Sequence, residues 1–337
     1  MFAEALAAGG LDGYFPLAEQ FHTQADPAFC GLGSLVVALN ALSIDPGRLW
    51  KGPWRWFAEE LLDCCVPLAQ VRERGVNLDE LTCLARCNGA EVDLQRADTA
   101  SLEAFRSALA GALSGDGVMV ASYDRASLGQ TGSGHFSPLA GFHRARDLVL
   151  VLDVARFKYP PHWLPAEQLW RAMQPLDSVT GRARGWMLLR RRAHGAALGF
   201  SLSCAGESWP VLGQQLRMVI AGLGEAPELL ALARAIAPLT AYLELRTPAA
   251  EAHREALRSA RTALCAIGAF PQIVEAVGTE RAEAVALLLL ASTELLQPAQ
   301  QAQLAVMAQA AESNPALVGE LSNLGAQLAA LWTHLAM

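Results

Sequence analysis

A change of composition near residues 193–205 limits the fold more than any other feature of this 337-residue sequence. Before it, six of the eight tryptophans and five of the seven cysteines lie among mixed helix-like and strand-like stretches. After "RRRAHGAALG" at 190–199, the chain is rich in Ala, Leu, Glu and Gln, with the apolar spacing typical of amphipathic helices. The change predicts two domains, an α+β domain over 1–192 and an all-α domain over 193–337.

Apolar patterns predict the individual elements of both parts. In the first part, helical spacing is found at 30–42, 78–87 and 101–113. Ser101 is a suitable cap for the third of these helices. Apolar and β-branched runs predict buried strands at 117–123, 147–155 and 186–191. In the second part, helices are predicted near 210–222, 227–244, 249–267, 270–275, 279–295, 298–311 and 315–335, with Pro238 kinking or splitting the second.

Charge and hydropathy exclude several classes of protein. A net charge of −7 without a basic block argues against general binding to nucleic acid or to anionic membranes. The most apolar stretch, 282–296, is too short to span a bilayer and is predicted to be a buried helix. Seven cysteines, an odd number at ordinary density, argue against a disulfide framework and predict reduced thiols in a cytoplasmic protein.

The stretch "QADPAFCGLGS" at 24–34 contains the first candidate for chemistry. Cys30 begins a predicted helix, where unsatisfied N–H groups and the helix dipole favour a thiolate over a thiol. The same position also suits a small buried side chain, since cysteine is often buried. Gln24, six residues earlier, has an amide that could donate to an oxyanion beside the Cys30 N–H.

Two later residues favour the nucleophile. "QTGSGHFSPLAGF" at 130–142 puts His135 after Gly134, in a glycine-containing turn where a backbone can approach a substrate closely. Asp153 follows the apolar run "LVLVL" and is suited to hold the His135 imidazole in one tautomer. The order Gln, Cys, His, Asp is that of papain-like cysteine peptidases. Together these residues favour nucleophilic catalysis over three unrelated structural roles.

Longer stretches carry a closer resemblance. The sequence resembles the phytochelatin synthases in "TQADPAFCGLGSLVVALNALSIDPGRLWKGPWRWF", "LLDCC", "CLARC", "QTGSGHFSP" and "LDVARFKYPPHW", which are spread over nearly all of 1–192. The resemblance implies a papain-like fold and glutathione γ-glutamylcysteinyltransferase activity in heavy-metal detoxification. It implies Cys30 as the nucleophile, His135 as general base and acid, Asp153 as the orienting carboxylate and Gln24 in the oxyanion hole.

The implied substrates are glutathione and growing phytochelatin peptides. Attack by Cys30 releases glycine and leaves a γ-Glu-Cys thioester, which the amine of a second substrate then attacks. An arginine is suited to the γ-glutamyl carboxylate because a guanidinium can donate two parallel hydrogen bonds. The candidates that the resemblance supports are Arg156 and Arg184, with Arg184 favoured as the clamp and Tyr159 in the same pocket. No organic cofactor is expected.

Four cysteines are weaker candidates for a metal site. Cys64 and Cys65 are adjacent, and Cys83 and Cys87 share one face of a predicted helix. No spacing of a structural zinc site is present, so core packing is the default interpretation. The resemblance implies that cadmium or zinc acts as an activator, or enters as a glutathione thiolate complex that is itself substrate.

Three interpretations stay open at this point. The first is the transferase; the second is a glutathione hydrolase with the same residues and little transfer; the third is a non-catalytic thiol or metal sensor. Plant members of the family carry a cysteine-rich C-terminal region, whereas 193–337 holds only Cys204 and Cys265. The predicted C-terminal helices could stabilise the first domain, shield a second substrate site or form a homo-oligomer.

Overall fold

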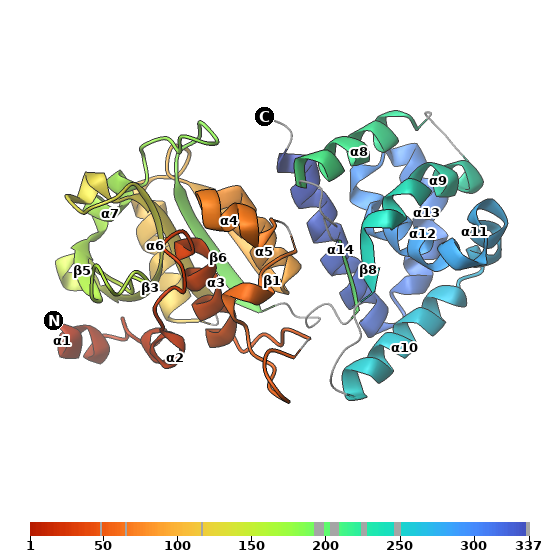
Figure 1. Ribbon diagram of the computed structural model, residues 1–337. Helices are drawn as coiled ribbons and strands as arrows, with labels where there is room; N and C mark the ends of the chain where they lie inside the picture. Colours follow the sequence, from red (N-terminus) through yellow and green to blue (C-terminus); the bar gives the residue numbers. More distant parts are fainter. Residues whose placement is uncertain are drawn as a thin grey trace.

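The computed structural model describes residues 1–47, 49–64, 66–115, 117–191, 199–202, 209–223, 228–245 and 251–334. Two parts lie side by side, a sheet with helices on both faces and a mainly helical part, at the left and right of Figure 1. The prediction of a mixed α/β part followed by a helical part is confirmed at this level. The predicted boundary between residues 192 and 193 touches residues outside the described ranges, and the domain limits stay a prediction.

Six strands form the sheet of the first part, and each neighbouring pair is antiparallel. Their order is β1-β6-β2-β3-β4-β5, with the bounds β1 Ala90–Arg96, β2 Gly117–Asp124, β3 Gly134–His143, β4 Leu148–Val151, β5 His162–Pro165 and β6 Gly185–Arg191. The strands predicted at 117–123 and 186–191 are confirmed. The one predicted at 147–155 was too long, because the chain leaves the sheet after Val151, so Asp153 lies beyond the end of β4.

Helices cover both faces of this sheet. The bounds are α1 Phe2–Ala7, α2 Tyr14–Gln20, α3 Cys30–Ala41, α4 Leu68–Arg74, α5 Leu78–Cys87, α6 Leu102–Leu113 and α7 Ala166–Ala172. Successive side chains of a strand point to opposite faces. On β2, Val118 and Val120 therefore join the core that contains α3 and α5, whereas Met119 and Ala121 join the core that contains α6 and α7.

The three helices predicted in this part are confirmed, and local capping explains where two of them begin. The Ser101 hydroxyl accepts a hydrogen bond from the Ala104 N–H, at 3.1 Å, at the start of α6. Asn77 and Glu80 exchange side-chain and backbone hydrogen bonds at the start of α5. Both pairs satisfy N–H groups that have no partner within their helix.

In the second part, a helix overlaps each of the seven predicted stretches. The bounds are α8 Trp209–Ala221, α9 Leu229–Ile236, α10 Glu251–Cys265, α11 Phe270–Val277, α12 Thr279–Ala291, α13 Pro298–Ala311 and α14 Pro315–His334. As one of the two outcomes predicted for Pro238, α9 ends at Ile236 and a separate 3-10 turn, η4 Ala237–Tyr242, follows. Most of α12 is buried, as predicted for 282–296. None of the helices in the described ranges is apolar over enough length to cross a membrane.

The all-α prediction for this part was wrong in one respect. Strands β7 (Phe200–Leu202) and β8 (Leu243–Leu245) pair in antiparallel fashion. Each strand has three residues, too few for an alternating pattern to be visible in the sequence. In addition, β8 follows η4 inside a stretch that was predicted to be helical.

Helix α14 joins the second part to the first. It packs against α5, and Figure 1 shows it on the side of the helical part that faces the sheet. Three fully buried polar residues on α14 contact β7. The Glu320 carboxylate and the Gln327 carbonyl accept hydrogen bonds from the N–H groups of Phe200 and Leu202, at 3.0 and 2.7 Å, and the Asn323 amide lies 3.5 Å from the Phe200 carbonyl.

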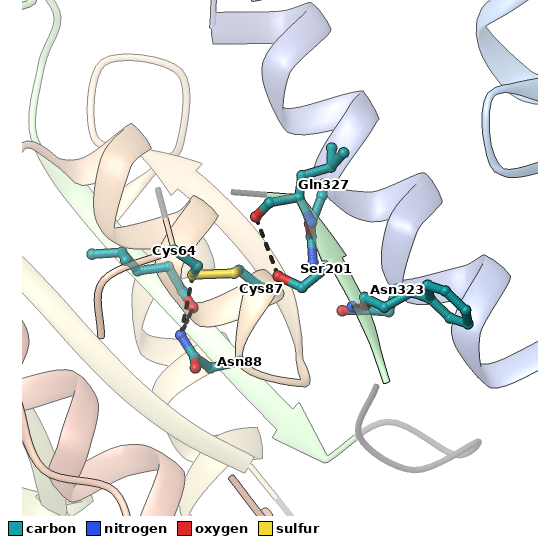
Figure 2. The surroundings of a disulfide bond; sticks show 9 residues. Cys64, Cys87, Asn88, Ser201, Asn323 and Gln327 are labelled. Atoms are coloured by element: carbon teal, nitrogen blue, oxygen red, sulfur yellow. Dashed lines mark hydrogen bonds between the residues drawn. A yellow bond between two sulfur atoms is a disulfide. The ribbon is translucent and has the colours of Figure 1, made fainter. Parts of the chain in front are cut away.

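The cysteines near α5 were predicted incorrectly. Cys64 and Cys87 form a disulfide, which lies beside β7 and α14 (Figure 2). The two residues are brought together by tertiary packing, with their Cα atoms 6.7 Å apart, so their separation in sequence held no sign of the bond. The prediction of reduced thiols is wrong for this pair, and the four-thiol metal site loses two of its thiols. Cys83 is buried, and Cys65 lies outside the described residues.

Candidate active site

Cys30 is the first residue of α3, as predicted, and its side chain is half-buried. The N–H groups of Gly31 and Phe136 point to its sulfur as hydrogen-bond donors. A Cβ at Gly31 would collide with the Val76 side chain, so a larger residue there would force one of them to move. Glycine thus lets the first turn of α3 lie close to the segment that leads into α5.

His135 reaches the sulfur from β3. Its backbone lies opposite Tyr123 of β2, and the two rings make an edge-to-face contact with 5.7 Å between their centroids. The His135 Nε2 lies 2.9 Å from the Asp153 Oδ1, which leaves Nδ1 for the hydrogen bond with Cys30. Thus the sheet register and the Tyr123 ring both fix the imidazole between a sulfur and a carboxylate.

Asp153 is fully buried just beyond the end of β4. Its Oδ1 accepts hydrogen bonds from the N–H of Ala155 and from Arg125 Nη2, both at 2.9 Å, and its Oδ2 lies 2.7 Å from the same Nη2. Burial alone would make an isolated carboxylate protonate or unfold the site. The guanidinium and the imidazole together compensate that cost.

The charges of these groups shift their pKa values in a consistent way. Burial raises the pKa of the Cys30 thiol, but the His135 charge, its hydrogen bond and the two backbone N–H groups outweigh burial, so the pKa is lowered. Burial lowers the pKa of His135, but Cys30 and Asp153 outweigh it, so this pKa is raised. Burial opposes ionisation of Asp153, but His135 and Arg125 outweigh it, so its pKa is lowered. The arrangement therefore favours a thiolate beside an imidazolium.

Arg125 is the residue of this cluster that sequence reasoning missed. It follows β2 in "YDRAS", the residue is 2% exposed, and it joins the site only through tertiary contacts. Its guanidinium also lies over the Tyr159 ring, 4.8 Å from the centroid. A single arginine after a strand has no local partner in the sequence. The one available signal was its position just before the glycine-containing turn that leads to His135.

Gln24 lies beside the first turn of α3, as expected, but its amide is already engaged. Its Nε2 donates to the carbonyls of Asp26 and Pro27, at 2.8 and 2.9 Å, whereas its buried Oε1 has no hydrogen-bond partner. To donate to an oxyanion, the amide would have to release one of those carbonyls. Its role in an oxyanion hole stays a prediction.

The four predicted substrate residues separate into three places. Gly134 and Arg184 lie together, since a Cβ on Gly134 would be 3.3 Å from Arg184 Nη2. Arg184 is 7% exposed, its Nη1 donates to two backbone carbonyls, and its buried Nε has no hydrogen-bond partner. Arg156 is exposed and lies over the Phe21 ring. Tyr159 packs against Arg125, and its hydroxyl accepts a hydrogen bond from the Thr131 N–H at 2.7 Å.

The described ranges contain no group of three or more His, Cys, Asp or Glu residues placed to hold a metal ion. The arrangement around Cys30 instead has what acyl transfer needs. It has a nucleophile of lowered pKa, an adjacent acid and base, and a carboxylate that fixes the base.

Comparisons with known proteins point the same way. Residues 1–186 match the family model for phytochelatin synthase. The chain is similar to glutathione gamma-glutamylcysteinyltransferase 1 of Arabidopsis thaliana, with 49% identity over 218 residues, covering 64% of this chain and 45% of that protein. For glutathione gamma-glutamylcysteinyltransferase 1 of Triticum aestivum the identity is 52% over 210 residues, covering 62% and 42%. For the Schizosaccharomyces pombe glutathione gamma-glutamylcysteinyltransferase it is 45% over 190 residues, covering 56% and 46%. The chain spans about half the length of these curated relatives.

Proposed function

Because the chain belongs to the phytochelatin synthase family, we propose that it is a glutathione γ-glutamylcysteinyltransferase with a papain-like catalytic domain. The observation that carries the proposal is the contact of His135 with both Cys30 and Asp153, which lowers the pKa of the thiol and raises that of the imidazole. A cysteine at a helix start facing a histidine on an antiparallel strand supports the papain-like assignment.

The first step is acylation. The Cys30 thiolate attacks the carbonyl carbon of the Cys–Gly amide in glutathione, and the carbonyl oxygen becomes an oxyanion. The N–H of Cys30 at the helix start is suited to stabilise this charge, with Gln24 as the second proposed donor. His135 then gives its proton to the departing amine, glycine leaves, and a γ-Glu-Cys thioester forms on Cys30.

The second step is transfer. The α-amine of another glutathione, or of a phytochelatin, loses a proton to His135 and attacks the thioester carbonyl. The C–S bond breaks, and the Cys30 thiolate is released beside the newly formed imidazolium. The product is longer by one γ-Glu-Cys unit, and the site returns to its starting charge state. Water in place of the amine would give γ-Glu-Cys alone.

Arg184 is the proposed clamp for the γ-glutamyl carboxylate. Its Nε is buried and unpartnered, and an unpaired buried donor costs free energy that a carboxylate ligand would recover. It lies next to Gly134, and Gly134 immediately precedes His135. Arg156 and Tyr159 keep their proposed place in substrate binding as secondary candidates.

The proposal extends to the surroundings of the reaction. Cadmium or zinc enters as an activator or as a glutathione thiolate complex, in which case the metal is part of the substrate. The cytoplasm is the proposed compartment because the substrate is a reduced thiol peptide. The helical part is proposed to stabilise the catalytic part, to shield the second substrate or to form a homo-oligomer.

Mass spectrometry of the purified protein incubated with glutathione tests this function, with and without cadmium or zinc. The thioester should add about 232 Da to the peptide that contains Cys30, the mass of γ-Glu-Cys less water. Elongated peptides together with this adduct would establish the transferase. The adduct with γ-Glu-Cys as the sole product would indicate the hydrolase. Neither adduct nor free glycine would overturn the proposal and favour the sensor.

A further inference from the structure

A chain of hydrogen bonds extends from Asp153 in the direction opposite to Cys30. Arg125 Nη2 donates to Asp153, and its Nη1 donates to the Gln130 Oε1 at 2.7 Å. The Gln130 Nε2 lies 3.2 Å from the His162 Nε2, and the His162 Nδ1 lies 2.8 Å from the Pro160 carbonyl oxygen. The acyl-transfer steps above use neither Gln130 nor His162.

The two ends of this chain fix the direction of each hydrogen bond in it. A guanidinium can only donate, and a carbonyl oxygen can only accept. His162 must therefore carry its hydrogen on Nδ1, and its Nε2 must accept. The Gln130 amide then has a single orientation that satisfies both neighbours, with its oxygen toward Arg125 and its nitrogen toward His162.

The surrounding loop keeps Gln130 in that place. The Gln130 N–H donates to the Arg125 carbonyl at 3.0 Å, which closes the turn that contains η2 (Ala126–Leu128). Gly129 has a φ of +68°, a conformation that glycine adopts without cost. The next residue, Thr131, donates its N–H to the Tyr159 hydroxyl, while the Tyr159 ring covers the Arg125 guanidinium.

We propose that Gln130 and His162 are positioning residues: they hold Arg125 so that its guanidinium stays on Asp153 and the carboxylate stays aligned with His135. The inference rests on the proposed function, because it concerns the same site. Arg125 is 2% exposed, so its guanidinium has little access to solvent that could replace the Gln130 oxygen. Without the Gln130 oxygen, the Arg125 guanidinium is free to turn away from Asp153. The Asp153 carboxylate is then held less firmly against His135, and the His135–Cys30 ion pair is stabilised less.

The test measures the state of Cys30 without using glutathione. The rate of Cys30 alkylation by iodoacetamide is followed against pH, with peptide mapping to separate Cys30 from the other cysteines. Because the thiolate is the reactive form, the midpoint of the profile reports the Cys30 pKa. Gln130→Met keeps the side-chain length and removes both hydrogen bonds. Its midpoint should move upward by up to about one pH unit, equivalent to the loss of about tenfold in thiolate stabilisation.

Two further variants show whether the effect follows the chain. His162→Phe keeps a ring but removes the acceptor for Gln130, and it should shift the midpoint in the same direction by a smaller amount. Gln174→Met is the matched control, because Gln174 is also half-buried and donates to the Ala97 carbonyl at 2.7 Å, outside the chain from Asp153 to Pro160. It should leave the midpoint unchanged.

The outcomes separate this inference from the proposed function. Superimposable profiles for wild type and Gln130→Met, with both proteins folded by circular dichroism, would overturn the positioning role. So would a shift of equal size in Gln174→Met. Glycine release from glutathione by the wild type tests the function independently. Its absence, with the alkylation shift intact, would remove the transferase and leave the positioning role standing.

Discussion

Two buried polar clusters in this molecule are built differently. The cluster proposed to be catalytic, called the catalytic cluster below, consists of Cys30, His135, Asp153 and Arg125, and its side chains contact one another. The α14 cluster consists of Glu320, Asn323 and Gln327, and its side chains contact the backbone of β7. In the catalytic cluster, each hydrogen bond depends on the charge of the neighbouring side chain. In the α14 cluster, the side chains complete the hydrogen bonds of a strand. Burial alone would not distinguish a reactive site from a structural contact.

The largest effect expected is on the nucleophile. Cys30→Ala should abolish glycine release, with a loss of roughly a thousandfold or more, because no other group in the mechanism forms the thioester. Glycine release from glutathione measures it, and the unfolding midpoint in urea should stay close to wild type. Activity of Cys30→Ala near the wild-type level would mean that Cys30 is not the nucleophile.

Removing the charge of Asp153 should have the next largest effect. Asp153→Asn keeps the shape of the side chain, but it no longer stabilises the imidazolium, and it leaves Arg125 with an uncompensated charge. A loss of about a hundredfold or more in the rate of thioester formation is expected, smaller than the loss of about ten-thousandfold for the carboxylate of serine protease triads, because two backbone N–H groups also stabilise the Cys30 thiolate.

Asp147→Asn is the control for that change. Asp147 pairs with Arg106 at 2.6 Å near the surface, and its φ of 51° is one that Asn tolerates. Equal losses of rate in the two variants would show that the charge of Asp153 has no special role.

The pH dependence of thioester formation should distinguish the catalytic cluster from the α14 cluster, because the Cys30–His135 pair belongs to the catalytic cluster. The pKa of Cys30 is lowered and that of His135 is raised, so the thiolate–imidazolium pair exists above the first and below the second. The rate of thioester formation should rise with pH through a value below that of an ordinary thiol, about 8.5, and fall through a value above that of an ordinary imidazole, about 6.5. Rapid-quench measurement of glycine release gives both limbs. A single limb near pH 8.5 would contradict the ion pair.

The smallest effect on chemistry is expected at Gln327. Gln327→Met removes the acceptor of the buried Leu202 N–H, which should lower the free energy of unfolding by roughly 1–3 kcal/mol. Urea unfolding measures the loss, with the exposed Gln303→Met as the matched control. Both limbs of the pH profile should stay in place. A shifted limb would show that the α14 cluster acts on the catalytic cluster.

The parts of the fold that were predicted correctly are those whose signal is local. Apolar patterns within each segment were sufficient for α3, α5, α6 and the helices of the second part, although α3 and α12 are buried over continuous runs of residues rather than on one face. Strands β1, β3 and β5 were not predicted. Glu91 and Asp93 are exposed on β1, and none of the four residues of β5 is buried, so neither strand carries a continuous apolar run. Strand β3 is buried beyond its first residue, but its sequence GHFSPLAGFH contains glycine and proline, which are depleted in strands.

The residues of the candidate site also differ in whether the sequence carries a local signal for them. Cys30, His135 and Asp153 were identified from their types and their order, and the structure brings them into contact. Arg125 and the Cys64–Cys87 bond depend on segments that meet only after folding. Gln24 lies beside α3, but its predicted role in the oxyanion hole stays a prediction, and the hydrogen bonds of its amide with Asp26 and Pro27 could not be read from sequence.

The contact between α14 and α5 has a consequence for synthesis on the ribosome. Chains emerge N-terminus first, and domains tend to fold as they emerge. The residues of the sheet are all made by Arg191, but Leu324, Leu328 and Leu331 of α14 belong to the same core as α5 and are made much later. Until α14 has been made, the sheet of the nascent chain can form, but helix α5 lacks the α14 neighbour against which it packs. That interval is when binding by a chaperone would matter most.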